Sequence, residues 1–121
     1  MFALLALLTT LHLTVKDNGH SFTVRPQRAI VVTLASNPST GYRWKYEPSK
    51  RGGKVVKLIS ARYVPPKSGS PPGAAGKEVW RLRAVGKGKI DLQFLDYPPG
   101  TYSRRGPNVE IAIIDFTIHV R

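Results

Sequence analysis

Residues 80–94 read WRLRAVGKGKIDLQF, and this stretch decides the fold class of the chain. Apolar residues occupy alternate positions on both sides of a short turn, Gly86-Lys87-Gly88. A period of two is typical of β-strands, because successive side chains point to opposite faces. Glycine takes the backbone angles that tight turns need at little cost. The stretch therefore predicts two strands, each with one face against a core.

The same alternation recurs along the chain, with turn residues between the apolar runs. Asp17-Asn18-Gly19 favours a hairpin that brings residues 22–24 back beside the first strand. Tyr42, Trp44 and Tyr46 share one face of another strand, and we expect their rings to pack in the core. The remaining strands are expected at residues 11–15, 29–34, 55–63 and from 109 to the end of the chain.

Seven or eight strands without a helical segment predict an all-β, Ig-like antiparallel β-sandwich. Strands that reverse direction at each connection place every second connection at the same end of the domain. Three loops then share one rim, namely Ser36 to Gly41, Val64 to Gly76 and Asp96 to Asn108. Loops grouped on a rigid sandwich are the arrangement that antibodies use for recognition. The sequence therefore indicates a binding surface at this rim.

The composition argues against an enzyme. The 121 residues fit one domain, and the absence of cysteine excludes disulfides, thiolate metal sites and a cysteine nucleophile. The three histidines are far apart in the sequence, and His12 and His119 fall in predicted strands, where an outward polar position explains them. The seven acidic residues show no metal-ligand spacing. We therefore expect no catalytic set, no metal and no cofactor.

The net charge of +12 favours encounters with anionic partners. The basic residues are scattered along the sequence and form no nucleic-acid-binding motif. Two interpretations remain open on the charge alone: a solvated basic surface, or an Ig-like binding module for an anionic surface or nucleic acid.

The first ten residues are distinct from the rest. The apolar run from Phe2 to Leu8 resembles the core of a secretory signal, although it lacks a positive flank and a clear cleavage site, and it is too short to span a bilayer. We expect residues 1–10 to be a signal-peptide remnant ahead of a domain at 11–121, and the protein to be periplasmic or secreted. A mis-set start or an early first strand are the alternatives, and they leave a cytoplasmic location open.

The hexapeptide Asn37-Pro38-Ser39-Thr40-Gly41-Tyr42 carries the clearest loop signal. Pro38 fixes its own φ and pushes Asn37 towards an extended conformation, while Gly41 can take a positive φ. We expect a stiff, narrow turn with small hydroxyl side chains at its tip. Taken alone, such a turn is more often a structural turn than a binding loop.

The hexapeptide, with Trp44 after it, resembles the signature loop of the chagasin family, proteinaceous inhibitors of papain-like cysteine peptidases with Ig-like sandwich folds. Gly73-Ala74-Ala75-Gly76 resembles the glycine-rich second loop of that family, with Ala75 where glycine is frequent. The segment 91–95 precedes a proline-containing third loop, in which Asp96-Tyr97-Pro98-Pro99 replaces the usual Arg-Pro-aromatic tripeptide. The resemblance covers the chain from about Leu11 onwards.

The resemblance implies a reversible, tight-binding inhibitor, acting as a monomer, that occludes the cleft of a papain-like cysteine peptidase. Ser39, Thr40 and Gly41 then block access to the catalytic cysteine, and Tyr97 or Tyr102 supplies an aromatic anchor. The residues that the resemblance assigns to peptidase binding are Asn37, Pro38, Ser39, Thr40, Gly41, Tyr42, Gly73, Ala74, Ala75, Gly76, Asp96, Tyr97 and Pro98.

Overall fold

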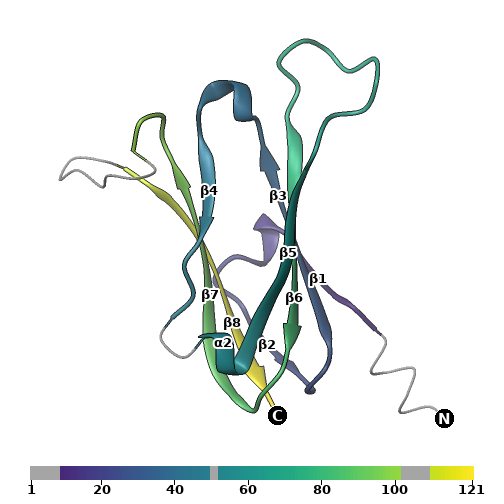
Figure 1. The fold of residues 1–121 in the computed structure, drawn as a ribbon, viewed down its shortest axis with the longest axis vertical. Helices are drawn as coiled ribbons and strands as arrows, with labels where there is room; N and C mark the ends of the chain where they lie inside the picture. Colours follow the sequence, from purple (N-terminus) through teal and green to yellow (C-terminus); the bar gives the residue numbers. More distant parts are fainter. Residues whose placement is uncertain (1–8, 50–51, 102–109) are drawn as a thin grey trace.

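A computed structural model of the protein describes residues 9–49, 52–101 and 110–121 (Figure 1). Eight strands in this part of the chain form two four-stranded sheets, which confirms the predicted sandwich. The first sheet has the order β1-β3-β6-β5 and the second has the order β2-β8-β7-β4. The strands are β1 (Leu11–Leu13), β2 (Ser21–Val24), β3 (Ala29–Ser36), β4 (Arg43–Tyr46), β5 (Val56–Val64), β6 (Gly76–Ala84), β7 (Gly88–Tyr97) and β8 (Ala112–Val120).

Helical structure in the described residues is confined to single turns: the 3₁₀ turns η1 (Val15–Asp17) and η2 (Pro38–Thr40), and the four-residue helix α2 (Gly52–Val55). None of these segments has the length and apolarity that a membrane-spanning helix requires.

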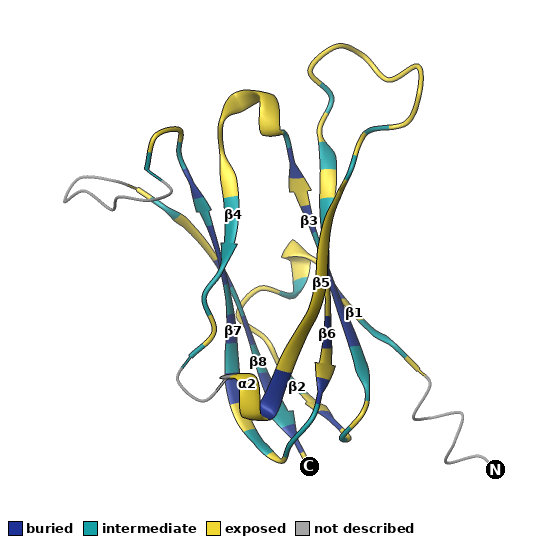
Figure 2. Cartoon of the chain, in the orientation of Figure 1, coloured by how far each residue is buried: buried dark blue, intermediate teal, exposed yellow. Residues whose placement is uncertain are grey.

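The core lies between the two sheets (Figure 2). The alternation in residues 80–94 is confirmed, since Trp80, Leu82 and Ala84 are buried while the arginines between them are exposed. Phe94 and Phe116 from the second sheet are completely buried. The rings of Trp80 and Phe94 meet edge to face, with centroids 5.3 Å apart, which is a favourable aromatic geometry across the sandwich.

The expected hairpin at Asp17-Asn18-Gly19 is wrong. β1 pairs parallel with β3, whereas β2 pairs parallel with β8 in the other sheet. The Asn18 side chain accepts a hydrogen bond from the Asp115 backbone N–H at 2.8 Å, and the Gly19 N–H donates to the Asp115 carbonyl at 2.7 Å. The turn thus attaches the chain to β8 as it crosses between the sheets, so two edge pairings are parallel and the others are antiparallel.

The predicted common rim is confirmed by the strand registers. Ser36 at the end of β3 pairs with Gly76 at the start of β6, so the first two loops leave the first sheet at the same end. Arg43 at the start of β4 pairs with Tyr97 at the end of β7, which brings the third loop to that end as well. Figure 1 shows the β3–β4 and β5–β6 connections at this end of the sandwich, together with the described residues that follow β7.

Candidate functional site

The first loop is a single 3₁₀ turn held by its own side chains. The Ser39 hydroxyl donates to the Asn37 side-chain oxygen at 2.6 Å, and the Thr40 hydroxyl donates to the Asn37 carbonyl at 2.7 Å. Gly41 ends the turn with a φ of 84°, the left-handed conformation that its sequence position predicts. Residues 38–42 are all exposed. The loop therefore presents a stiff, solvent-facing tip whose hydroxyl protons are already engaged.

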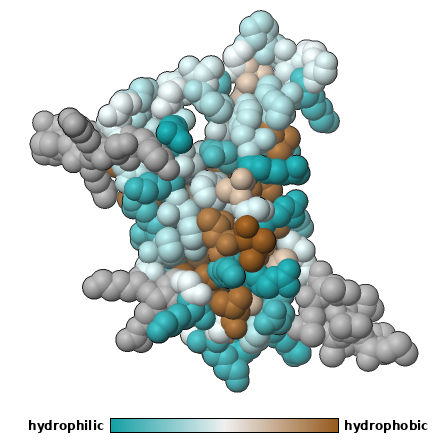
Figure 3. Space-filling view, in the orientation of Figure 1, coloured by the Kyte–Doolittle hydropathy of each residue, from teal (hydrophilic) through white to brown (hydrophobic). Residues whose placement is uncertain are grey.

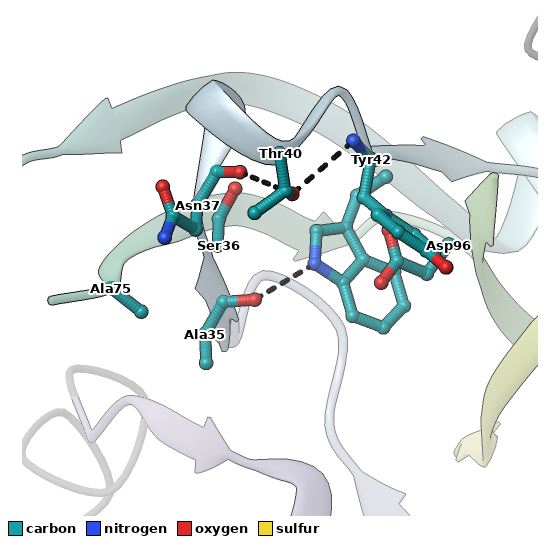
Figure 4. Close-up of a pocket in the computed structure, with 8 residues that line it drawn as sticks. Ala35, Ser36, Asn37, Thr40, Tyr42, Ala75 and Asp96 are labelled. Carbon is teal, nitrogen blue, oxygen red and sulfur yellow. Dashed lines mark hydrogen bonds between the residues drawn. The ribbon is translucent and has the colours of Figure 1, made fainter. Parts of the chain in front are cut away.

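Trp44 fixes the base of this loop. Its indole N–H donates to the carbonyl of Ala35 at 3.0 Å, so a side chain on β4 bonds to the backbone of β3 in the opposite sheet (Figure 4). The same close-up shows Thr40 between Asn37 and Tyr42 above the indole. Tyr42 itself is 46% exposed, which contradicts its predicted packing in the core. β4 begins only at Arg43, so Tyr42 belongs to the loop instead of to the strand.

The second loop spans residues 65–75 and is bonded to the first. The Asn37 side-chain amide donates to the carbonyl of Gly73 at 3.0 Å. Gly73 has a φ of 80°, a backbone conformation that favours glycine. Gly76 lies in β6, where a Cβ would overlap the Val64 carbonyl oxygen and the Tyr63 ring. Glycine at this position thus lets β5 and β6 converge below the loop, with Ala74 and Ala75 next to it.

The third loop begins at Pro98, two residues later than predicted, and contacts the first loop through Pro99. Residues 102–108 of the predicted loop lie outside the described residues. A Cβ placed on Gly41 would lie 2.9 Å from Pro99 Cγ, so the proline ring is seated against the glycine backbone. Pro98 accepts two hydrogen bonds on its carbonyl from Thr101, one from the backbone N–H at 3.1 Å and one from the hydroxyl at 2.6 Å. Sequence reasoning missed Pro99, because no sequence pattern reveals a contact between two loops.

The assignment of Tyr97 as an aromatic anchor is wrong. Tyr97 lies at the end of β7, is only 4% exposed, and donates its hydroxyl hydrogen bond to Glu47 at 3.2 Å. The ammonium group of Lys45 lies 5.9 Å from the ring centroid. Tyr97 thus supports the outer side of the second sheet, and the other candidate anchor, Tyr102, lies outside the described residues.

Two carboxyl groups lie behind the first loop. Desolvation raises the pKa of Asp96, which lines the pocket in Figure 4 together with Tyr42 and Trp44. Burial also raises the pKa of Glu78, and the negative charge of Asp96 raises it further. A hydrogen bond with Ser36 and the positive charge of Arg43 act in the opposite direction and lower this pKa. Glu78 is a second residue that sequence reasoning missed. The signal was present, because Glu78 has the same strand parity as Trp80 and Leu82 and therefore points inward.

In the part of the chain that the structure describes, the first loop is thus joined to the second by the Asn37 to Gly73 hydrogen bond and to the start of the third by the Gly41 to Pro99 contact. Among the described residues, no three His, Asp or Glu side chains gather as metal ligands. The surface presents backbone, small hydroxyl residues and one exposed aromatic ring. Such an arrangement is suited to binding a concave partner.

The sequence of residues 23–120 matches the model of the chagasin family of peptidase inhibitors, designated I42. The chain belongs to the chagasin family. This is a family of inhibitors and not of enzymes, in agreement with the sequence-based expectation. No curated protein sequence matches the chain significantly.

Solved structures with the same fold include a cysteine protease inhibitor from Entamoeba histolytica, with a TM-score of 0.70 and 17% identity over 93% of this chain and 95% of that one. The protein ICP of Leishmania mexicana has a TM-score of 0.56 and 22% identity, over 90% of this chain and 94% of that one. PbICP-C, solved in complex with falcipain-2, has a TM-score of 0.53 and 14% identity, over 94% and 91% of the two chains. At these identities the likeness shows that the chagasin-family sandwich is shared.

Proposed function

We propose that this chain is a reversible, tight-binding inhibitor of papain-like cysteine peptidases that occludes the active-site cleft with its three loops. The observation that carries the proposal is the first loop, a pre-formed turn joined to both of its neighbours. Membership of the chagasin family supports it. The complex of a structural neighbour, PbICP-C, with falcipain-2 gives further support.

The loop chemistry favours a block without covalent bond formation. Ser39 and Thr40 carry no electrophilic carbon for a cysteine thiolate, and their hydroxyl groups donate to Asn37 within the loop. The tip therefore fills the space over the catalytic cysteine and leaves the thiol unmodified. Because the turn is already ordered, little conformational entropy is lost on docking, which favours high affinity.

Tyr42 replaces Tyr97 as the aromatic contact in this proposal. Its ring is exposed at the rim, where it lines a hollow together with Asp96 and residues 110–112. Aromatic side chains at the centre of an interface often contribute much of the binding energy. We therefore assign Tyr42 to direct contact with the peptidase, and Asp96 and Tyr97 to support of the loops.

Titration of papain and a cathepsin-like enzyme with the purified domain tests the function. We expect inhibition that is complete at a molar ratio near unity and is reversed on dilution. Thr40→Glu is expected to weaken inhibition by about a hundredfold, since a charge at the tip enters the cleft without a partner. Thr23→Glu, on an exposed position of β2, is the matched control and should inhibit as the native chain does. Absence of inhibition at micromolar concentrations across several such enzymes contradicts the proposal.

We also propose that the inhibitor acts in the periplasm or outside the cell. The apolar run of residues 2–8 supports an export signal, and it lies outside the described residues. Fractionation of the native cells, with sequencing of the N-terminus of the recovered protein, tests this location. Recovery in the cytoplasm with residues 1–10 retained contradicts it.

A further inference from the structure

The outer face of the first sheet carries an unbalanced positive charge. Trp80, Leu82 and Ala84 point into the core, so the residues that alternate with them on β6 point outward, and the register with β5 extends this face to the neighbouring strand. Five exposed cations occupy it, and we call them the basic face: Lys57, Arg62, Lys77, Arg81 and Arg83.

None of the seven acidic residues of the chain balances this charge. Glu78 pairs in register with the core residue Leu34 and therefore points inward. The other acidic residues lie on or beside the second sheet: Asp17, Glu47, Asp91, Asp96, Glu110 and Asp115. Within residues 9–49, 52–101 and 110–121, no ion pair involves a member of the basic face.

Repulsion between the cations of the basic face lowers the stability of the first sheet. Lys57 on β5 lies directly opposite Arg83 on β6, and Arg81 lies two residues further along the same face. Like charges directly opposite one another destabilise a sheet, and no neighbouring acid offsets the repulsion here. A bound anionic surface would remove this repulsion. Binding such a surface therefore explains why the cations are grouped here, whereas contact with solvent alone does not.

Exposed apolar side chains lie at the edge of the basic face. β5 is an edge strand with an irregularity between Leu58 and Ser60, and Ile59 at that point is 54% exposed. The space-filling view shows a hydrophobic patch over β5 with strongly hydrophilic side chains beside it (Figure 3). A row of cations next to exposed aliphatic groups is the combination that binds a bilayer interface.

We propose that the basic face docks the inhibitor on a bilayer that contains anionic phospholipid, leaving the three loops free to bind a peptidase. The outward positions of β3, β5 and β6 carry no aromatic residue. Sheets that bind single-stranded nucleic acid stack the bases on aromatic side chains, so this face is better suited to lipid headgroups. The docking is independent of the inhibitory function, because the face and the loops share no assigned residue.

Co-sedimentation with large vesicles of phosphatidylcholine containing about 30 mol% phosphatidylglycerol, in about 0.1 M salt, tests the proposal. The test variant replaces four cations of the basic face with glutamine: Lys57, Arg62, Arg81 and Arg83. The control variant removes the same number of exposed cations elsewhere: Lys16, Arg25, Lys87 and Lys89. Each cation near an anionic surface contributes about fivefold to partitioning, so the test variant should bind at least about a hundredfold more weakly than the native chain. The control variant should stay within about threefold, because remote charges are screened.

A second variant separates an electrostatic surface from a shaped anion site. The triple change Arg62→Lys, Arg81→Lys and Arg83→Lys keeps the charge and loses the planar guanidinium groups, so it should retain vesicle binding. Equal weakening of the test and control variants overturns the proposal, as does equal binding to vesicles without phosphatidylglycerol. Binding of an oligonucleotide without binding of vesicles also overturns it. Peptidase titration of the same variants reports on inhibition separately, so failure of one function leaves the other measurable.

Discussion

Gly41→Ala is the substitution that tests the joined loops most sharply. Gly41 has a φ of 84°, and an alanine in the left-handed region costs about 1–2 kcal/mol. The added Cβ also lies 2.9 Å from Cγ and 3.0 Å from Cβ of Pro99, contacts that require one loop to move. Overpacking of this kind adds about 1–3 kcal/mol. We therefore expect a total loss of about 2–5 kcal/mol in the free energy of unfolding or of peptidase binding.

Gly19→Ala is the matched control, because Gly19 has a φ of 81° and no heavy atom within 4 Å of the added Cβ. It carries the conformational cost alone and lies outside the three loops. The assay is a thermal melt of each variant, at about 4 °C per kcal/mol, together with its inhibition constant against papain. Gly41→Ala should weaken inhibition at least about tenfold more than Gly19→Ala. Equal inhibition by the two variants would refute the claim that Pro99 positions the first loop.

Three further predictions concern Asn37 in the first loop and two side chains below it, Tyr46 and Glu78. Asn37→Asp keeps the acceptor for Ser39 but loses the amide that donates to Gly73, so the inhibition constant should rise about tenfold, as measured by peptidase titration. Tyr46→Phe should leave the melting temperature unchanged or raise it, because the buried Tyr46 hydroxyl has no partner among the described residues and burial raises its pKa to about 12. The raised pKa of Glu78 means that the folded state binds this proton more tightly than the unfolded chain does, so stability should fall as the pH rises from the ordinary glutamate value through the raised one. Melting curves over that pH range should show a shallower fall for Glu78→Gln than for the native chain.

Alternation and turn chemistry predicted the strands and the common rim. The period of two placed Trp80 and Leu82 inside, and Gly41 took the left-handed conformation expected of it. These features depend on a residue and its immediate neighbours, so the local sequence is sufficient to predict them. The common rim followed because the strands that border the three loops are antiparallel to their neighbours.

The partners of the edge strands and the roles of Tyr42 and Tyr97 were not predictable in the same way. Asn18-Gly19 has the composition of a hairpin turn, yet its polar groups bond to Asp115, ninety-seven residues away from Asn18. Tyr42 and Tyr97 are both tyrosines at the border between a loop and a strand. Tyr97 is the last residue of β7 and is buried, whereas β4 begins one residue after Tyr42, whose ring is exposed. Likewise, the Gly41 to Pro99 contact depends on how two sheets are placed relative to one another. Long-range geometry of this kind leaves no periodic signal in the sequence.

The rate at which a small alkylating reagent modifies the catalytic cysteine of papain, with and without one molar equivalent of the domain, tests most directly whether the loops occlude the cleft. If Ser39, Thr40 and Gly41 lie over the thiol, the rate should fall in proportion to the fraction of enzyme bound, and alkylation should resume when the complex is diluted. Alkylation at the rate of free papain, while hydrolysis of a protein substrate is inhibited, would place the domain outside the active site and contradict the account.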